Sequence, residues 1–126
     1  MRILIDTHIL IWHLEDDKRL TAQHGNIIED SNNRVFVSVA SLWEIAIKTS
    51  RGKLSLSRPI EDIFSEIERS TSSILLIKAN HSLHVSKLIF HHNDPFDRMI
   101  IAQALVEGLP VMSTDKNFAA YGVTLL

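Results

Sequence analysis

The chain has 126 residues, enough for one domain with a sizeable hydrophobic core. Its 45% hydrophobic and 22% charged residues exclude a disordered or fibrous chain, and the absence of cysteine excludes disulfides and thiolate zinc sites. The formal net charge of -2 excludes a global basic field, so any attraction to RNA or DNA must come from local patches or a bound metal.

Short apolar runs alternate with helical segments along the whole chain. The expected strands are rich in β-branched and aromatic residues, and the expected helices show apolar spacing and capping residues. The expected strands are 3–5, 34–38, 73–77, 111–113 and an edge strand at 123–126. The expected helices are 7–14, 20–30, 39–49, 59–67, 80–90, 94–107 and 116–120. This alternation predicts one domain spanning 1–126, a three-layer α/β/α fold with a central, mostly parallel sheet of four to five strands.

Several helix ends are predicted from capping residues. Pro59 opens one helix at its first turn, and Asn80 is expected to cap the helix that follows the third strand. Gly52 and Gly108 are expected to end their helices at C-caps. No signal-peptide pattern or membrane-length apolar stretch occurs, so we expect a complete, cytoplasmic protein that does not contact a membrane.

Four acidic residues stand out because each falls where a strand-like run gives way to a helix, or in the first turns of that helix. They are Asp6, Glu44, Asp97 and Asp115. In an open parallel sheet these junctions line one edge, where ligands bind. Clustered carboxylates need a compensating cation, and Mg²⁺ or Mn²⁺ prefers carboxylate and water oxygens. The pattern therefore predicts metal-dependent cleavage of a phosphodiester, with these four acids as catalytic metal ligands.

Each acid also has a purely structural interpretation. Asp6 and Asp115 are suited to cap the helices that follow them, and Ser41 with Glu44 matches a capping box. Asp97 is suited to complement the dipole of its helix. These interpretations explain the acids one at a time but not as a set.

Glu44 and Asp97 favour the shared-cation interpretation because both lie in largely apolar helices. Neither has an expected basic partner nearby, since Arg98 is adjacent to Asp97 and neighbours on a helix do not face each other. Unpaired burial of one charge costs several kcal/mol, on the order of 3–5. A cation held jointly by the acids removes that cost.

Other polar residues are expected near the same rim. Asp94 is expected to cap the helix that begins at Pro95, with support of the metal ligands as the alternative role. The remaining residues, suited to orienting water or carboxylates or else to ordinary turn chemistry, are Thr7, Ser38, Thr114 and Asn117.

The histidines and basic residues give weaker signals. The seven histidines lack the His-Glu-x-x-His pattern, and His81, His84, His91 and His92 have no obvious carboxylate partner at ligand spacing, which disfavours zinc. His8 is the histidine nearest the proposed site. A basic group after Glu44 is either solvated surface or a patch that follows phosphates; it comprises Lys48, Arg51, Lys53 and Arg58. No P-loop, dinucleotide fingerprint or nucleophile elbow is present.

Four segments together resemble PIN-domain sequences, and more narrowly the VapC-type toxins of bacterial toxin–antitoxin pairs. They are ILIDTH at 3–8, SVASLWEI at 38–45, DPFDRMIIAQA at 94–104 and STDKNF at 113–118. The segments follow the family's order along essentially the whole chain, and the Asp-Pro-Phe-Asp-Arg stretch at 94–98 is the most specific.

The resemblance implies a fold, an activity and partners. Asp6, Glu44 and Asp97 resemble the family's first three metal-binding acids, and Asp115 resembles the more variable fourth. The implied activity is Mg²⁺- or Mn²⁺-dependent endoribonuclease cleavage of RNA by metal-activated water. The implied partners are a small antitoxin, whose tail blocks the acidic groove, and a second copy of the chain.

Two alternative functions are also compatible with the residues. One is a phosphatase-like hydrolase with Asp6 as nucleophile, although His8 stands where such enzymes carry a second aspartate. The other is a non-catalytic binding module whose acidic groove holds a basic peptide.

Overall fold

The computed structural model describes residues 1–70 and 72–126. Within these residues a single sheet has four parallel strands in the order β3-β2-β1-β4. The strands are β1 (Arg2–Ile5), β2 (Arg34–Ser38), β3 (Ser73–Leu75) and β4 (Val111–Met112). The helices are α1 (Thr7–Leu14), α2 (Ala22–Glu29), α3 (Val39–Ser50), α4 (Ile60–Arg69), α5 (Ala79–Lys87), α6 (Pro95–Glu107) and the 3₁₀ helix η1 (Lys116–Tyr121). The expected parallel α/β architecture is confirmed.

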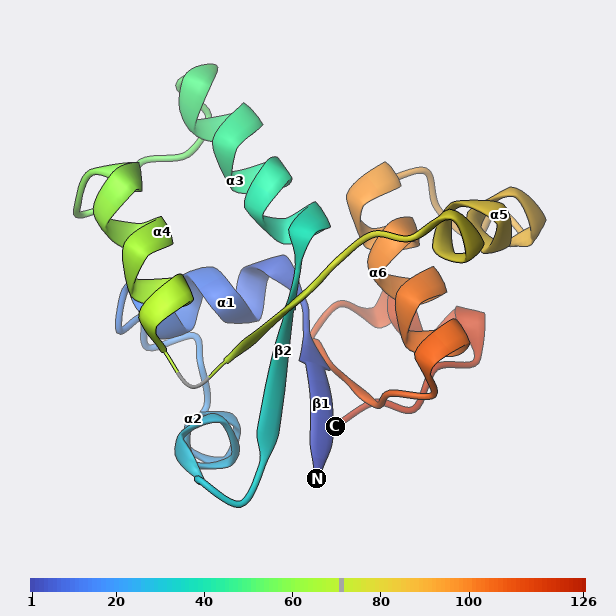
Figure 1. Ribbon diagram of the computed structural model, residues 1–126, viewed down its shortest axis with the longest axis horizontal. Helices are drawn as coiled ribbons and strands as arrows, with labels where there is room; N and C mark the ends of the chain where they lie inside the picture. The colour runs from blue at the N-terminus through green and yellow to red at the C-terminus, as the bar shows by residue number, and fades with distance from the viewer. Residues whose placement is uncertain (71) are drawn as a thin grey trace.

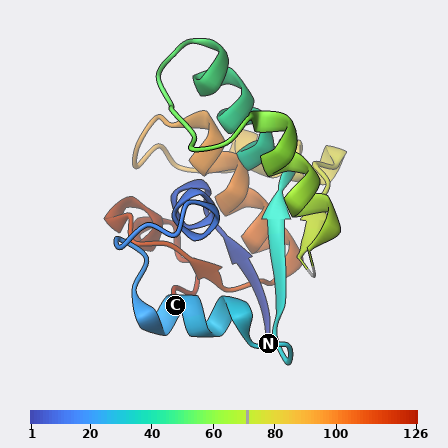
Figure 2. The same cartoon turned by 90° about the vertical axis from the view of Figure 1, so that its left-hand side faces the viewer.

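Helices cover both faces of the sheet, because successive strand residues point to opposite sides. Ile3 and Ile5 of β1 pack into one core with Ile9 of α1, Ile45 of α3 and Ile63 of α4. Figure 1 shows α1, α2 and α4 on this side of the strands and α5 and α6 on the other. In Figure 2 the first group lies in front of the sheet and α6 behind it.

The second core fills the opposite face. Leu4 of β1 and Phe36 of β2 pack there with Ile100 and Ile101 of α6 and with Phe118 of η1. Both cores exclude water from the strands, so the polar groups that serve a site are confined to the strand ends.

The order of the strands determines where a ligand would meet the sheet. From β1 the chain adds β2 and then β3 on one side, and it returns to place β4 on the other side of β1. Ile5 is in register with Val37 of β2 and Met112 of β4. Asp6 and Ser113 therefore directly follow β1 and β4, and Ser38 ends β2, at the same edge of the sheet, beside the point where the strand order reverses.

Some expected boundaries are wrong. The edge strand at 123–126 is reduced to one bridge between Val111 and Leu125, and the short helix after Asp115 is a 3₁₀ helix. Helix α5 begins earlier than expected: the imidazole of His81 accepts the backbone N–H of Lys78 at 3.0 Å, so Asn80 lies inside the helix. These errors concern helix and strand ends, where competing caps decide the boundary. The expected end of α3 is confirmed: Arg51 is the C-cap residue, and Gly52 follows it at φ +68° and donates its N–H to the carbonyl of Thr49 at 3.1 Å.

Among the described helices, none combines the length and the apolar character needed to cross a membrane.

Candidate active site

Asp6 lies directly after β1 and both caps a helix and faces the strand edge. Its Oδ1 accepts the backbone N–H of Ile9 at 2.8 Å, and its Oδ2 accepts the hydroxyl of Ser113 at 2.5 Å. Burial raises the pKa of the Asp6 carboxyl, these hydrogen bonds and His8 oppose the rise, and the charge of Asp115 adds to it. The capping and site interpretations of Asp6 are therefore compatible.

Glu44 lies in the second turn of α3 and is only 3% exposed. The expected helix start at Val39 is confirmed, because Ser38 caps α3. The alternative capping box with Ser41 does not form, since the Ser41 hydroxyl accepts a hydrogen bond from Thr7 at 2.9 Å. Oε2 of Glu44 accepts the ammonium of Lys48 at 2.5 Å. Oε1 is buried and has no hydrogen-bond partner within the described chain.

Asp97 lies in the first turn of α6, just after the cap that Asp94 provides. One carboxylate oxygen of Asp94 accepts the N–H groups of Phe96 and Asp97 at 2.9 and 3.0 Å, which confirms the expected cap. Oδ2 of Asp97 lies 3.1 Å from Nε2 of His92. Burial, followed by the charge of Asp94, raises the pKa of Asp97 to about 6, although the His92 hydrogen bond lowers it.

Asp115 follows β4 and completes the acidic group at the strand edge. It caps η1 by accepting the N–H of Asn117 at 2.9 Å, and it is half-buried. Its charge raises the pKa of both Asp6 and Asp97, and the charge of Glu44 also raises the pKa of Asp97. The fold thus brings all four acids into one electrostatic neighbourhood from four separate stretches of the chain.

The expectation that Glu44 and Asp97 lack nearby basic partners is wrong. Lys48 is four residues after Glu44, the spacing and order that favour an ion pair on a helix. The hydrogen bond to Glu44 raises the pKa of Lys48, and the charges of Asp94 and Asp97 contribute to the rise. His92 is the partner of Asp97. Part of the acidic charge is therefore compensated by the chain itself.

The residue types and burial nevertheless fit a hard divalent cation. Among residues 1–70 and 72–126, no three His, Asp or Glu side chains are already arranged to hold an ion, since Asp6 bonds to Ser113, Glu44 to Lys48 and Asp97 to His92. The buried Oε1 of Glu44 is an acceptor without a donor, which is a costly state unless a cation completes it. Carboxylate oxygens are the donor set that Mg²⁺ and Mn²⁺ prefer.

The remaining rim residues have separate local roles. Ser38 is buried and donates its hydroxyl to Gln103 at 2.5 Å, and Thr7 is bonded to Ser41, so both join elements together. Thr114 is exposed, and the backbone N–H of Asn117 donates to the Asp115 carboxylate that caps η1. Ser113 donates a hydrogen bond to Asp6 and was not among the predicted site residues. Its position directly after β4 could have indicated that it lies at the same edge of the sheet.

Two histidines have carboxylate partners that the sequence analysis did not find. His81 is fully buried and lies 2.8 Å from Glu107 across α5 and α6, and this contact lowers the pKa of Glu107. His92 contacts Asp97. Neither belongs to a group of three or more potential metal ligands within the described residues. His8 is exposed beside Asp6.

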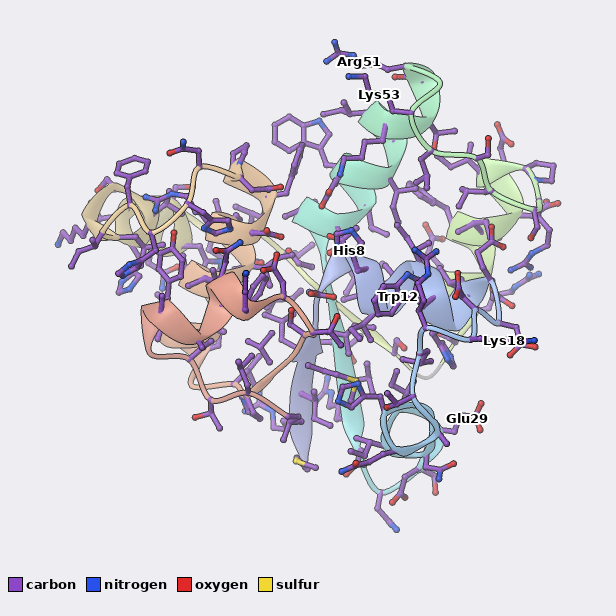
Figure 3. The ribbon with its side chains drawn as sticks, turned by 180° about the vertical axis from the view of Figure 1, so that it is seen from behind. His8, Trp12, Lys18, Glu29, Arg51 and Lys53 are labelled. Carbon is purple, nitrogen blue, oxygen red and sulfur yellow. The ribbon has the colours of Figure 1, made fainter. Side chains whose placement is uncertain are left out.

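A polar recess adjoins Glu44 on the α1 side. A cavity of about 250 Å³ includes Thr7, His8, Trp12, Lys48 and Lys53 in its lining. Figure 3 shows His8 and Trp12 along α1, with Arg51 and Lys53 at the far end of α3. Of the expected basic patch, only Lys48 and Lys53 line this recess. Arg58 instead pairs with Glu66 at 2.8 Å.

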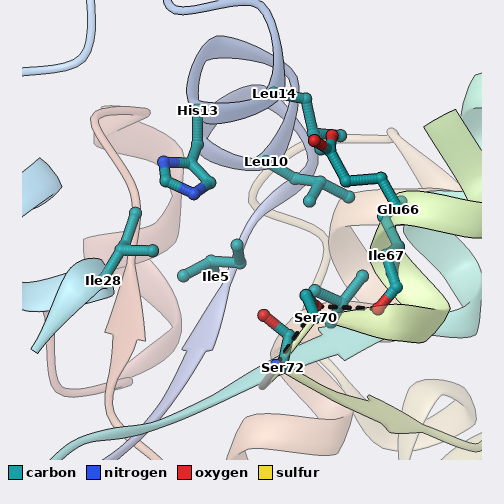
Figure 4. A pocket seen from close by; sticks show the side chains of 10 residues that line it. Ile5, Leu10, His13, Leu14, Ile28, Glu66, Ile67, Ser70 and Ser72 are labelled. Atoms are coloured by element: carbon teal, nitrogen blue, oxygen red, sulfur yellow. Dashed lines mark hydrogen bonds between the residues drawn. The ribbon is translucent and has the colours of Figure 1, made fainter. Parts of the chain in front are cut away.

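A second cavity lies away from the acids (Figure 4). It has a volume of about 200 Å³ and is enclosed by α1, α2, α4 and the strands, with Leu10, His13, Ile28 and Ile67 in its wall. None of the four acids lines it, so it is separate from the candidate site.

Comparison with known proteins now assigns the family. The PIN domain model matches residues 3–123. The chain belongs to the PIN domain family. A curated relative, ribonuclease VapC22 of Mycobacterium tuberculosis, is 20% identical over 119 residues, which are 94% of this chain and 91% of that protein.

Solved structures share the PIN fold across the whole chain. VapBC2 of Rickettsia felis, bound to a DNA fragment of its promoter, has a TM-score of 0.74 at 17% identity and covers 100% of this chain and 98% of that one. VapC20 of Mycobacterium tuberculosis, a toxin that cleaves the sarcin-ricin loop, has a TM-score of 0.66 at 18% identity and covers 97% and 96% of the two chains. The fold is therefore that of VapC-type PIN domains.

Proposed function

We propose that this PIN domain is a metal-dependent endoribonuclease and the toxin of a toxin–antitoxin pair. The observation that carries the proposal is the group of four acids at the carboxyl edge of the sheet, in which Glu44 presents a buried oxygen without a donor. The names of the relatives, a ribonuclease and toxins paired with antitoxins, support RNA as the substrate.

Asp6, Glu44, Asp97 and Asp115 would hold one or more Mg²⁺ or Mn²⁺ ions. When bound, such a cation supplies a water of lowered pKa as nucleophile and positive charge for the leaving oxygen. The chain's own contribution is orientation: Ser113 fixes one oxygen of Asp6, and Asp94 fixes the turn that carries Asp97. Lys48 forms an ion pair with Glu44, which would also bind the cation. Lys48 lines the recess beside Glu44, where its ammonium would contact a substrate phosphate.

The proposal includes two protein partners and a compartment. A small antitoxin would bind this chain, a proposal supported by the VapBC relatives, and its tail would cover the acidic groove. A second copy of the chain would form a homodimer. Cleavage of cellular RNA by such a toxin would take place in the cytoplasm.

Cleavage of RNA by the purified chain, free of any antitoxin, tests the proposal. Single-stranded RNA should be cut with Mg²⁺ or Mn²⁺, and EDTA should stop the reaction. Asp6→Asn and Asp97→Asn should each lower the rate by more than about 100-fold, because metal ligands matter more than the groups that support them. Asp62→Asn, which changes an exposed acid on α4, is the matched control and should retain the rate.

Equal rates in the wild type and in both site variants would refute the assignment. Mn²⁺ binding by calorimetry without cleavage of any RNA would instead favour the binding-module alternative. The phosphatase alternative gains no support from the structure, because the residue two positions after Asp6 is His8.

A further inference from the structure

His92 lies on the loop between α5 and α6, beside the candidate metal ligand Asp97. Its Nε2 is 3.1 Å from Oδ2 of Asp97, and its Nδ1 is 2.8 Å from the hydroxyl of Tyr121. The imidazole therefore connects a carboxylate of the active site with a phenol at the end of η1. The proposed chemistry assigns no role to this imidazole.

The chemistry of the three groups determines the direction of the hydrogen bonds. An ionised carboxylate only accepts, so Nε2 of His92 carries the proton that is donated to Asp97. In the neutral ring Nδ1 is then an acceptor, and the Tyr121 hydroxyl has one proton for two acceptors, Nδ1 of His92 at 2.8 Å and the His92 carbonyl at 3.3 Å. The shorter contact favours a chain of bonds that runs from Tyr121 through His92 to Asp97.

Arg98 holds Tyr121 and the loop in place. Arg98 is only 3% exposed, and its guanidinium donates to the Tyr121 hydroxyl at 3.2 Å and to the carbonyl of Ile89 at 3.0 Å. It also packs on the ring of Phe90, with 3.8 Å between Cζ and the ring centroid. Further bonds from its guanidinium go to the carbonyls of Val85 and Leu88 at the end of α5.

We infer that His92 is a positioning residue that fixes the carboxylate of Asp97 for metal binding, with Tyr121 holding its tautomer and Arg98 holding its loop. The inference rests on the proposed function, since it concerns the same metal site. Groups that hydrogen-bond to metal ligands restrict the ligand's orientation, and their loss costs about 10- to 100-fold in metal affinity.

Mn²⁺ binding to the full chain, measured by calorimetry, tests the inference. His92→Leu should weaken binding by about 10- to 100-fold. His92→Gln should stay within a few-fold of the wild type, because the glutamine amide can donate from a position similar to that of Nε2. His84→Leu is the matched control: His84 lies on α5, and within the described residues its side chain has no bond or ring contact with Asp97, His92 or Tyr121.

A spectroscopic measurement adds a readout that does not need the metal. The ¹⁵N shifts of the His92 ring should identify the Nε2–H tautomer in the wild type, and Tyr121→Phe should reduce its population. Tyr121→Phe should also weaken Mn²⁺ binding, and this variant serves if His92→Leu does not fold.

The outcomes separate the inference from the proposed function. If the wild type binds no Mn²⁺, both are overturned. If the wild type binds Mn²⁺ and His92→Leu or Tyr121→Phe binds it equally well, only the inference is overturned. Failure of His92→Gln to restore the affinity would also contradict a positioning role through Nε2.

Discussion

At the scale of single residues, the stability of the acidic site depends on how far hydrogen bonds and ion pairs offset the cost of burying its carboxylates. Glu44 has one oxygen paired with Lys48 and one without a partner. Leaving a buried acceptor unsatisfied costs about 1–3 kcal/mol. The cation of the proposed function would remove this cost by bonding to the free oxygen of Glu44.

The pH dependence of stability tests a related cost, that of burying the charged carboxylate of Asp97. Its folded pKa of about 6 exceeds the ordinary value of 3.8, so the folded state binds the proton more tightly than the unfolded state. Metal-free stability should therefore be highest below pH 3.8 for this group and should fall as pH rises to about 6. Above that window the penalty should be roughly 1–3 kcal/mol.

Urea unfolding in EDTA at several pH values measures this penalty. Asp97→Asn should be more stable than the wild type at pH 7 and should lose this part of the pH dependence, because the amide does not ionise. Asp62→Asn serves as the exposed control. A variant that is no more stable than the wild type at pH 7 would show that the Asp97 charge carries no penalty in the fold.

At the scale of elements, the site depends on helix ends. Asp6, Ser38 and Asp94 each cap a helix at the strand edge, so the same short stretches that start α1, α3 and α6 also present the site residues. Caps of this type contribute about 1 kcal/mol each. Local stability and the geometry of the site are therefore coupled.

Two glycines give opposite predictions for the helices that carry them. Gly25 lies inside α2, and an added Cβ would make an ordinary contact of 3.9 Å with Leu20. Gly25→Ala should stabilise the fold by roughly 0.5–1 kcal/mol, because alanine loses less backbone entropy. Gly108 ends α6 at φ +66°, so Gly108→Ala should destabilise it by about 1 kcal/mol or more despite the open space around it. Thermal melts of the two variants at one pH provide the comparison, and shifts of the same sign would contradict it.

At the scale of the whole molecule, an apolar groove lies near the acids on the side of α5 and α6. It has a volume of about 350 Å³ and includes Trp43, Phe90, Phe96 and Met99 in its wall. Trp43 is 60% exposed and Phe90 is 73% exposed. Exposed aromatic residues of this kind are typical of homodimer interfaces, which makes the groove the candidate contact for the proposed second copy.

Sedimentation over a range of concentrations tests the dimer. The wild type should dimerise, and Trp43→Ala should raise the dissociation constant by roughly 30-fold, as expected for a buried tryptophan worth about 2 kcal/mol. Leu125→Ala, at a less exposed apolar residue in another part of the chain, should leave it unchanged. A wild type that stays monomeric would contradict the homodimer. A dimer insensitive to Trp43→Ala would place the interface elsewhere.

Much of the fold followed from local sequence patterns. The alternation of apolar runs and helices predicted a parallel α/β sheet, and Asp6 and Asp94 were correctly identified as helix caps. These features depend on residues within about four positions of each other, so their physical cause is present in the local sequence. The position of the four acids at strand–helix junctions was predictable for the same reason.

Only the tertiary structure decided how the acids are compensated. Ser113 bonds to Asp6 across 107 positions, and Tyr121 bonds to His92 across 29. Such contacts depend on which strands become neighbours and on where a loop folds back, and no short-range pattern specifies either. Lys48 is the exception, since its spacing from Glu44 was a local signal that the sequence analysis did not use. The sequence by itself therefore determined which acids stand near the strand–helix junctions, because local patterns set those junctions. The packing of distant segments determined how the carboxylates are bonded within the described residues, such as Asp6 to Ser113.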